Sequence, residues 1–152
     1  MNPALELRLL ARVRVDIGEF ILPGEVPAGQ RRVIPITGGA VEGPELFGEV
    51  VPLGADWNLA RTDGSETVLA HYLIRTRDGV VLSVRNEGVI RDRPSGRMGI
   101  TVLEIEAPIE SDYAWLNETP LVGSLVAEEH EGSITVCLEY WYAAPADEAP
   151  QR

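Results

Sequence analysis

The chain has 152 residues and a formal net charge of −11, and its thirteen basic residues are all arginine. A chain of this length suits one domain with a core that needs neither disulfides nor a structural metal. The absence of lysine excludes Schiff-base chemistry and a P-loop phosphate site. The acidic balance disfavours nucleic acid and anionic membrane surfaces as partners, because both would repel the chain.

The sequence carries no targeting or membrane signal that we recognise. No uncharged apolar run approaches the roughly 18 residues of a membrane-spanning helix. Glu6, Arg8 and Arg12 interrupt the apolar residues near the N-terminus, whereas a secretory signal has a continuous apolar stretch. Cys137 is the only cysteine, which excludes an internal disulfide and fits a reducing compartment. These features predict a cytoplasmic protein.

In chain order, the first predicted element is a strand over residues 5–15, where apolar and polar residues alternate with a period of two, although residues 9–11 also fit a helix. Glycine and proline predict a long loop over residues 18–30. Strands are expected over residues 32–36 and 45–51. The segment 52–57, which contains proline and glycine, is expected to be a loop.

Tight turns then predict a series of hairpins. Asp78 and Gly79 separate two apolar runs, and a two-residue Asp-Gly turn between such runs is a strong hairpin signal. The polar residues 91–99 predict a mobile loop. Further strands are expected over residues 67–77, 80–86, 100–107, 113–117, 121–128 and 133–142. The domain is expected to span residues 1–143, with a disordered tail over residues 144–152.

About eight to ten strands at regular spacing, with no helix longer than two turns, indicate an all-β domain. A barrel removes the unpaired edges that an open sheet exposes. A barrel of about eight strands is also near the smallest that can hold one ligand. We therefore predict a single closed or nearly closed antiparallel β-barrel with a ligand-sized interior.

Strand parity predicts which side chains face that interior. Tyr72 shares its face with Ala70 and Ile74, and Asn86 ends an apolar row that begins at Val80. A buried polar group without a hydrogen bond costs roughly 1–3 kcal/mol, so both polar groups need partners. Neighbouring backbone or a bound ligand could supply them, and the sequence leaves both interpretations open.

Asp56 and Trp57 place a carboxylate beside a large indole ring. Burial disfavours the charged form of a carboxylate, so Asp56 could serve as a general acid or base with a raised pKa. An aspartate in a loop can equally cap a turn by hydrogen bonding to backbone two residues further on. The residues alone favour the cap.

Other catalytic constellations are weak. His71, His130 and Cys137 do not make a convincing metal site, although His71 with carboxylates stays open as a minor alternative. No serine lies in a Gly-x-Ser-x-Gly turn. The glycine-rich segment 38–43 lacks the spacing of a dinucleotide-binding loop. We therefore expect neither a metal nor an organic cofactor.

Six segments, taken together, form a motif pattern that is specific enough to suggest a family, although each segment alone would be a weak signal. They are residues 31–39, 42–44, 54–57, 75–79, 84–88 and 113–117. Together they resemble the uncharacterised protein family 0311, also termed domain of unknown function 3237, over about residues 7–142. The resemblance implies a small bacterial or fungal β-barrel, similar in shape to calycin and allene oxide cyclase barrels.

The resemblance also implies a ligand pocket built from the polar residues of the shared motifs. In this chain they are Asp56, Trp57, Tyr72, Arg85, Asn86, Trp115 and Asn117. In this interpretation Asp56 is the general acid or base, and Tyr72, Asn86 and Asn117 donate hydrogen bonds to a developing oxyanion. Trp57 and Trp115 wall the pocket, and Arg85 holds a substrate carboxylate.

The function that we predict is binding of a small organic metabolite, aromatic or carbonyl-bearing. The catalytic form of this hypothesis is a cofactor-independent isomerase, cyclase or lyase. The alternatives are a non-catalytic metabolite-binding protein and an interaction module with a solid core, so catalysis itself is left open. The expected partners are the small-molecule ligand and a second copy of the chain in a homodimer.

Overall fold

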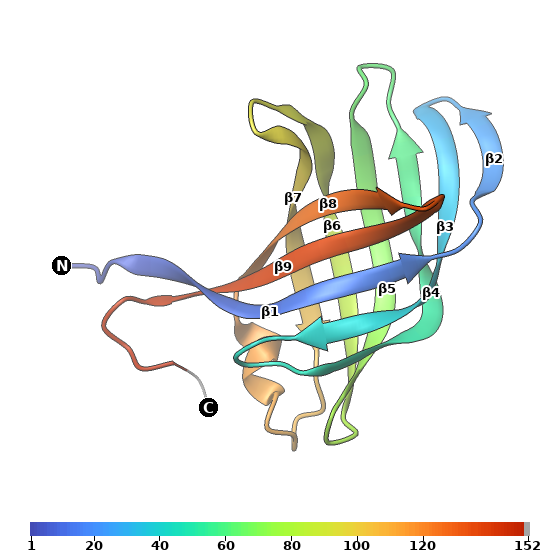
Figure 1. Cartoon of the computed structure of the whole chain (residues 1–152). Coiled ribbons are helices and arrows are strands. Elements are labelled where there is room, and N and C mark those ends of the chain that lie inside the picture. Colours follow the sequence, from blue (N-terminus) through green and yellow to red (C-terminus); the bar gives the residue numbers. More distant parts are fainter. Residues whose placement is uncertain (151–152) are drawn as a thin grey trace.

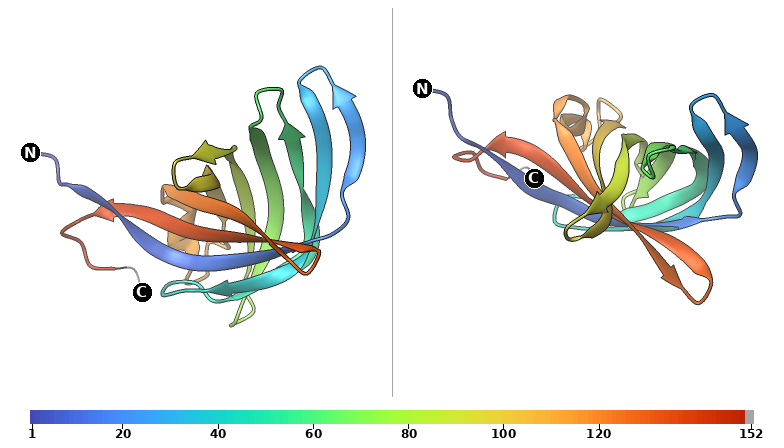
Figure 2. Two further views of the ribbon diagram at one scale, coloured as in Figure 1. Left: turned by 45° about the horizontal axis from the view of Figure 1, so that its top comes forward. Right: turned by 90° about the horizontal axis from the view of Figure 1, so that it is seen from above.

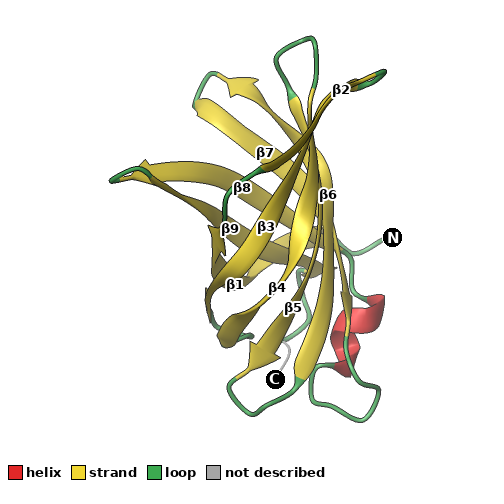
Figure 3. Cartoon of the chain, turned by 90° about the vertical axis from the view of Figure 1, so that its right-hand side faces the viewer, coloured by secondary structure: helices red, strands yellow, loops and turns green. Residues whose placement is uncertain are grey.

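The structure, a computed structural model, describes residues 1–150 as nine antiparallel strands and one short 3₁₀ helix. The strands are β1 (Leu5–Ile17), β2 (Ile21–Val26), β3 (Gly29–Glu42), β4 (Gly48–Ala60), β5 (Glu66–Thr76), β6 (Val81–Arg93), β7 (Gly96–Glu106), β8 (Leu121–His130) and β9 (Ser133–Pro145). The helix η1 (Ala114–Glu118) lies at the end of the barrel opposite the β2–β3 hairpin (Figure 3). Within residues 1–150, no helix has the length and apolar character needed to cross a membrane.

The sheet closes on itself because β1 pairs with β9 on one side and with β3 on the other. The strand order β1-β9-β8-β7-β6-β5-β4-β3 therefore returns to β1 as an eight-stranded antiparallel barrel. The additional strand β2 pairs with β3 beyond the end of β1. Figure 1 shows β1, β8 and β9 crossing the direction of β5 and β6. The predicted all-β closed barrel is confirmed.

Glycine and proline lie within strands of this barrel, and two predicted loops are therefore wrong. Residues 18–30 contain β2 and the start of β3, joined by a tight turn. Residues 52–57, including Asp56 and Trp57, lie inside β4. The ladders on either side of β4 shift register between Val50 and Gly54 and between Pro35 and Gly39. These positions are bulges, where a strand accommodates Gly and Pro without ending.

Three predictions in the C-terminal half are also wrong in detail. Residues 91–99 form the β6–β7 hairpin, in which Arg97 bonds to Asp92 and Glu66. Residues 113–117, predicted as a strand, fall mostly in η1. Strand β9 runs to Pro145, two residues into the predicted tail, and pairs there with β1. The end of that predicted tail, Gln151 and Arg152, lies outside the described residues.

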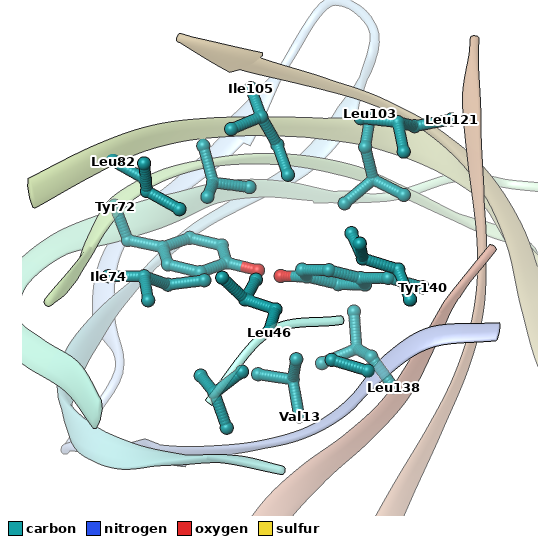
Figure 4. Close-up of a cluster of buried hydrophobic side chains, with 14 of the residues drawn as sticks. Val13, Leu46, Tyr72, Ile74, Leu82, Leu103, Ile105, Leu121, Leu138 and Tyr140 are labelled. Atoms are coloured by element: carbon teal, nitrogen blue, oxygen red, sulfur yellow. The ribbon is translucent and has the colours of Figure 1, made fainter. Parts of the chain in front are cut away.

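The inward faces of the strands carry the core. On β5 the buried residues Ala70, Tyr72 and Ile74 alternate with exposed or half-buried ones, and on β6 Asn86 is buried at the end of its apolar row. The parity predicted for both strands is confirmed. Figure 4 shows Tyr72 and Tyr140 entering the core from opposite walls with their hydroxyl groups pointing toward one another.

The barrel wall parts at one end because β7 and β8 pair over only a short stretch, from Gly99 with Leu125 to Leu103 with Leu121. Beyond that stretch, Val126–His130 of β8 pair with β9. In the view from above in Figure 2, the β8–β9 and β2–β3 hairpins diverge from one another. Residues of both hairpins line an internal cavity at this end.

Candidate functional site

A cavity of about 240 Å³ lies inside the barrel at the end where these hairpins diverge. Most of its wall is aliphatic, with contributions from β1, β3, β5, β8 and β9 such as Val15, Ile34, Val68, Leu125 and Leu138. Its polar wall residues are Arg32, Asp56, Asn58, Glu66, Tyr72 and Asn86. A mostly apolar hollow with a few converging polar groups is the usual makeup of a small-molecule site.

Asp56 lines this cavity from an inward position of β4. It pairs with Ala70 of β5, and the next pair along the ladder is Leu59 with Thr67. Between these two pairs, the backbone N–H of Leu69 donates to Asp56 Oδ1 at 2.8 Å. Burial raises the pKa of Asp56 above its usual value, and this exceeds the opposing effects of the hydrogen bonds from Leu69 and Asn58. The aspartate is therefore a strand residue with a weakened acidity, and the turn cap that the residues alone favour is wrong.

A network of three polar side chains lies beside Asp56. Arg32 Nε donates to Asn58 Oδ1 at 2.9 Å, and Arg32 Nη2 lies 3.1 Å from Glu66 Oε2. Asn58 Nδ2 donates to Asp56 Oδ2 and to Glu66 Oε2, each at 3.4 Å. Burial raises the pKa of Glu66, but the hydrogen bond from Arg97 and the charge of Arg32 outweigh it, so the net pKa is lowered. Glu66 therefore holds its charge as the partner of Arg32.

Arg32, Asn58 and Glu66 are not among the predicted site residues, although strand alternation points to Arg32 and Glu66 as inward-facing. Arg32 shares a strand face with Ile34, and Glu66 shares one with Val68. Both charged residues thus occupy the inward positions of their strands. Asn58 shares its strand face with Asp56, but residues 52–57 are predicted as a loop, so no alternation is counted from Asp56 to Asn58.

Tyr72 and Asn86 lie deeper in the cavity and have no internal partners. Among the described residues, the Tyr72 hydroxyl and both amide atoms of Asn86 make no hydrogen bond, and the two residues are only 3% and 1% exposed. The hydroxyls of Thr101 and Tyr140 are buried and unpartnered in the same way. Buried polar groups are nearly always satisfied in folded proteins. The structure thus brings Asp56, Tyr72 and Asn86 together around one cavity, with hydrogen-bonding capacity to spare.

Two of the other predicted site residues face away from this cavity. Trp57 is 50% exposed on the outer surface of the barrel, next to the inward-facing Asp56. Arg85 is exposed beside Asn86 and pairs with Glu87 at 2.5 Å. Trp57 and Arg85 line a shallow outer hollow that also includes Leu69 and Val102. Adjacent strand residues point to opposite faces, so each pair is divided between the inside and the outside.

The last two predicted site residues lie at the far end of the barrel. The Trp115 ring packs edge-on against Tyr142, with ring centroids 5.1 Å apart. The Asn117 side chain accepts a hydrogen bond from the Ala107 N–H at 2.8 Å and donates to the Ala107 and Ala114 carbonyls at 3.0 Å each. These contacts fix η1 against the end of β7, and neither residue lines the cavity.

Asp56 is expected to titrate above the pH range of an exposed aspartate, and a ¹³C carboxyl NMR titration measures this pKa. Asp56 has a higher pKa in the native protein than in the unfolded chain. At a pH between these two pKa values, Asp56 is protonated in the native state and has lost its proton in the unfolded state. The Asp56 contribution therefore makes the free energy of unfolding fall as pH rises through this range. Comparing the wild type with Asp56→Asn should show that slope in the wild type alone. A midpoint at or below that of an exposed aspartate contradicts the burial assigned to Asp56.

Known proteins resemble this chain along most of its length. Residues 5–142 match the family described as "Protein of unknown function (DUF3237)". A UPF0311 protein of Rhodopseudomonas palustris (strain TIE-1) is 38% identical over 89 residues, which are 59% of this chain and 58% of that protein. A UPF0311 protein of Clostridium acetobutylicum is 39% identical over 78 residues, or 51% of this chain and 49% of that protein. The matched segments thus span about half to three-fifths of these curated relatives.

Solved structures share the barrel. A β-barrel like protein from Acinetobacter baumannii AYE has a TM-score of 0.84 at 27% identity, covering 95% of this chain and 99% of that chain. A conserved protein of unknown function from R. palustris has a TM-score of 0.77 at 29% identity, covering 92% and 99%. An enzyme from Penicillium herquei has a TM-score of 0.70 at 23% identity, covering 95% and 97%, a likeness of fold alone. With the family match running from β1 into β9, the chain belongs to the DUF3237 family of β-barrel proteins of unknown function.

Proposed function

We propose that the barrel binds a small organic metabolite, aromatic or carbonyl-bearing, and acts on it as a cofactor-independent isomerase, cyclase or lyase. One observation carries the proposal. The cavity has a carboxyl group of raised pKa on one wall and unpartnered hydrogen-bonding groups on another. Titratable groups with perturbed pKa values in a cavity are characteristic of functional sites.

The strand register places Asp56 and Asn86 far enough apart for a ligand ring to lie between them. Asp56 pairs with Ala70, and Ala70 pairs with Asn86, so the three residues form one row across β4, β5 and β6. Two strand spacings separate the outer members by about 9–10 Å. Only the methyl group of Ala70 stands between them in that row, which leaves space for a ligand ring.

The chemistry assigned to these groups is proton transfer. Asp56 gives a proton to, or removes one from, the reacting carbon or oxygen, and its raised pKa keeps more of the acid form near neutral pH. The Tyr72 hydroxyl and the Asn86 amide donate hydrogen bonds to the oxygen on which negative charge develops. Isomerisation and cyclisation can move a proton from one position of a substrate to another through Asp56. In an elimination, the Asp56 carboxylate would take a proton from carbon, and the leaving group would depart with its bonding electrons and take up that proton. These three groups therefore suffice for all three reaction types. Trp57, Arg85, Trp115 and Asn117 have no ligand contact in this proposal.

Filling the space above Ala70 is expected to abolish ligand binding. The Ala70→Leu side chain would occupy the gap between Asp56 and Asn86 without changing any polar group. A thermal-shift screen with small aromatic and carbonyl compounds provides the measurement, since a ligand at 100 times its Kd adds about 2.7 kcal/mol to stability. The wild type should be stabilised by a hit that leaves Ala70→Leu unshifted.

The matched control is His71→Leu, which adds a similar side chain at the neighbouring outward position of β5. This variant should respond to the hit as the wild type does. A hit that stabilises Ala70→Leu fully would place the binding site elsewhere. Turnover of a bound hit should be lost in Asp56→Asn, and full turnover by that variant would contradict the role of Asp56 as proton carrier.

A further inference from the structure

We infer that the cavity takes an uncharged ring compound of one or two rings, with a carbonyl or phenol oxygen against Tyr72 and Asn86, and that it excludes carboxylates. The inference rests on the proposed function and names the substrate class of the same site. It departs from the sequence-based expectation that Arg85 holds a substrate carboxylate.

The charges on the cavity wall leave no cation free for an anion. Arg32 is the one basic residue among the described residues of this wall, and it already contacts Asn58 and Glu66. On the described wall of the cavity itself, Asp56 and Glu66 set two carboxyl groups against one guanidinium, and the second arginine that Glu66 pairs with, Arg97, does not line the cavity. A ligand carboxylate would lose its water shell in this cavity without gaining an unshared cation, which is strongly unfavourable.

The deepest polar groups are neutral, and they suit an uncharged oxygen. Burial raises the pKa of Tyr72, so its hydroxyl stays protonated and can donate a hydrogen bond. The Asn86 amide can donate through Nδ2 and accept through Oδ1, and neither atom has a partner among the described residues. A carbonyl oxygen can accept from both side chains, and a phenol can also donate to Asn86. Such a ligand would satisfy groups that the folded chain leaves unsatisfied.

The size of the cavity limits the ligand to a small ring system. An apolar protein cavity of about 150 Å³ holds benzene, so the 240 Å³ found here suits one ring with substituents or two fused rings. Aliphatic side chains such as Val68, Ile34 and Leu138 form the wall against which the ring would pack. The ring would span from Asp56 toward Asn86 above Ala70.

Three probes with the same bicyclic ring system and different groups at one ring carbon test this inference by isothermal titration calorimetry at neutral pH. They are 1-tetralone, its parent hydrocarbon tetralin, and 1,2,3,4-tetrahydro-1-naphthoate. The ketone should bind most tightly, because only it offers a neutral acceptor. Tetralin and the carboxylate should each bind roughly tenfold or more weakly, since one lacks the oxygen and the other must be desolvated with its charge.

Two variants separate the contributions. Asn86→Leu should bring the affinities for ketone and hydrocarbon close together, because it removes one of the groups that distinguish them. Glu66→Gln should raise the carboxylate affinity relative to the ketone, because it releases Arg32 from its ion pair. Arg85→Gln, on the outer surface, is the control and should change none of the three affinities.

Two results would overturn the inference. A wild-type protein that binds the carboxylate as tightly as the ketone, with both lost in Ala70→Leu, refutes the uncharged class but leaves the pocket standing. Failure of all three probes to bind refutes the class as well. In that case the library screen with Ala70→Leu still decides separately whether the cavity is a ligand site.

Discussion

Gly39→Ala is expected to lower the free energy of unfolding by at least about 3 kcal/mol, because it blocks closure of the barrel. Gly39 pairs with Val15 of β1 on one side and with Val50 of β4 on the other. Its φ is +148°, and a Cβ atom there would lie 1.9 Å from the Arg14 carbonyl oxygen. Backbone must move to relieve that overlap, and the backbone concerned joins the two ends of the sheet. Denaturant unfolding of the variant measures the loss.

The control for this substitution is the preceding residue. Gly38→Ala carries almost the same backbone strain, with φ at +145°, but its Cβ would come no nearer than 3.9 Å to the Val50 carbonyl oxygen. We expect this variant to lose only about 1–2 kcal/mol, the cost of the backbone conformation itself. Equal losses in the two variants would contradict the importance of the close approach between β1 and β3.

Asn86→Leu is expected to have opposite effects on stability and on binding. The amide of Asn86 is buried and has no hydrogen-bond partner within residues 1–150, and its neighbours across the ladder are Ala70 and Leu103. Replacing it with an apolar side chain of similar size should raise the free energy of unfolding by about 1–2 kcal/mol, since a buried unsatisfied polar group is destabilising. The same change should weaken binding of the proposed ligand. A functional site commonly lowers stability in this way.

Tyr140→Phe separates the two effects. The Tyr140 hydroxyl is also buried, with no hydrogen-bond partner in the described part of the chain, but Tyr140 does not line the cavity. Denaturant unfolding should show a gain in stability, and titration calorimetry should show unchanged ligand affinity. A loss of stability in Asn86→Leu would mean that the amide has a partner, such as an ordered water, in the free protein.

Strand parity predicted the inner surface of the barrel where the ladder is regular. Between β5 and β6 the pairing runs without a shift from Glu66 with Ile90 to Arg75 with Val81, and both Tyr72 and Asn86 were correctly placed inside. In β3 and β4 the alternation of inward and outward residues cannot be followed along the whole strand. Bulges at Pro35–Gly39 and Val50–Gly54 shift the register and change which residues face inward. Glycine and proline predict turns in general, but here they mark bulges within long strands.

The predicted site combines residues from the inner and outer faces of the barrel. A motif shared within a family shows which positions recur, but it does not show whether their side chains point into the barrel or out of it. Asp56 with Trp57 and Asn86 with Arg85 are adjacent pairs on strands, so one member of each pair must point outward. Trp115 and Asn117 fix η1 at the opposite end. Arg32 and Glu66, by contrast, were readable as inward charges. A charged residue on the apolar face of a strand is the signal that could have found them.

The most direct test of the account is a crystal structure of the protein with the strongest hit of the ligand screen. We predict electron density for the ligand inside the barrel, between Asp56 and Asn86, with an oxygen atom within hydrogen-bond distance of Tyr72 or Asn86. Density confined to the outer hollow beside Trp57 and Arg85, with the cavity empty, would contradict the claim that the barrel interior is the functional site.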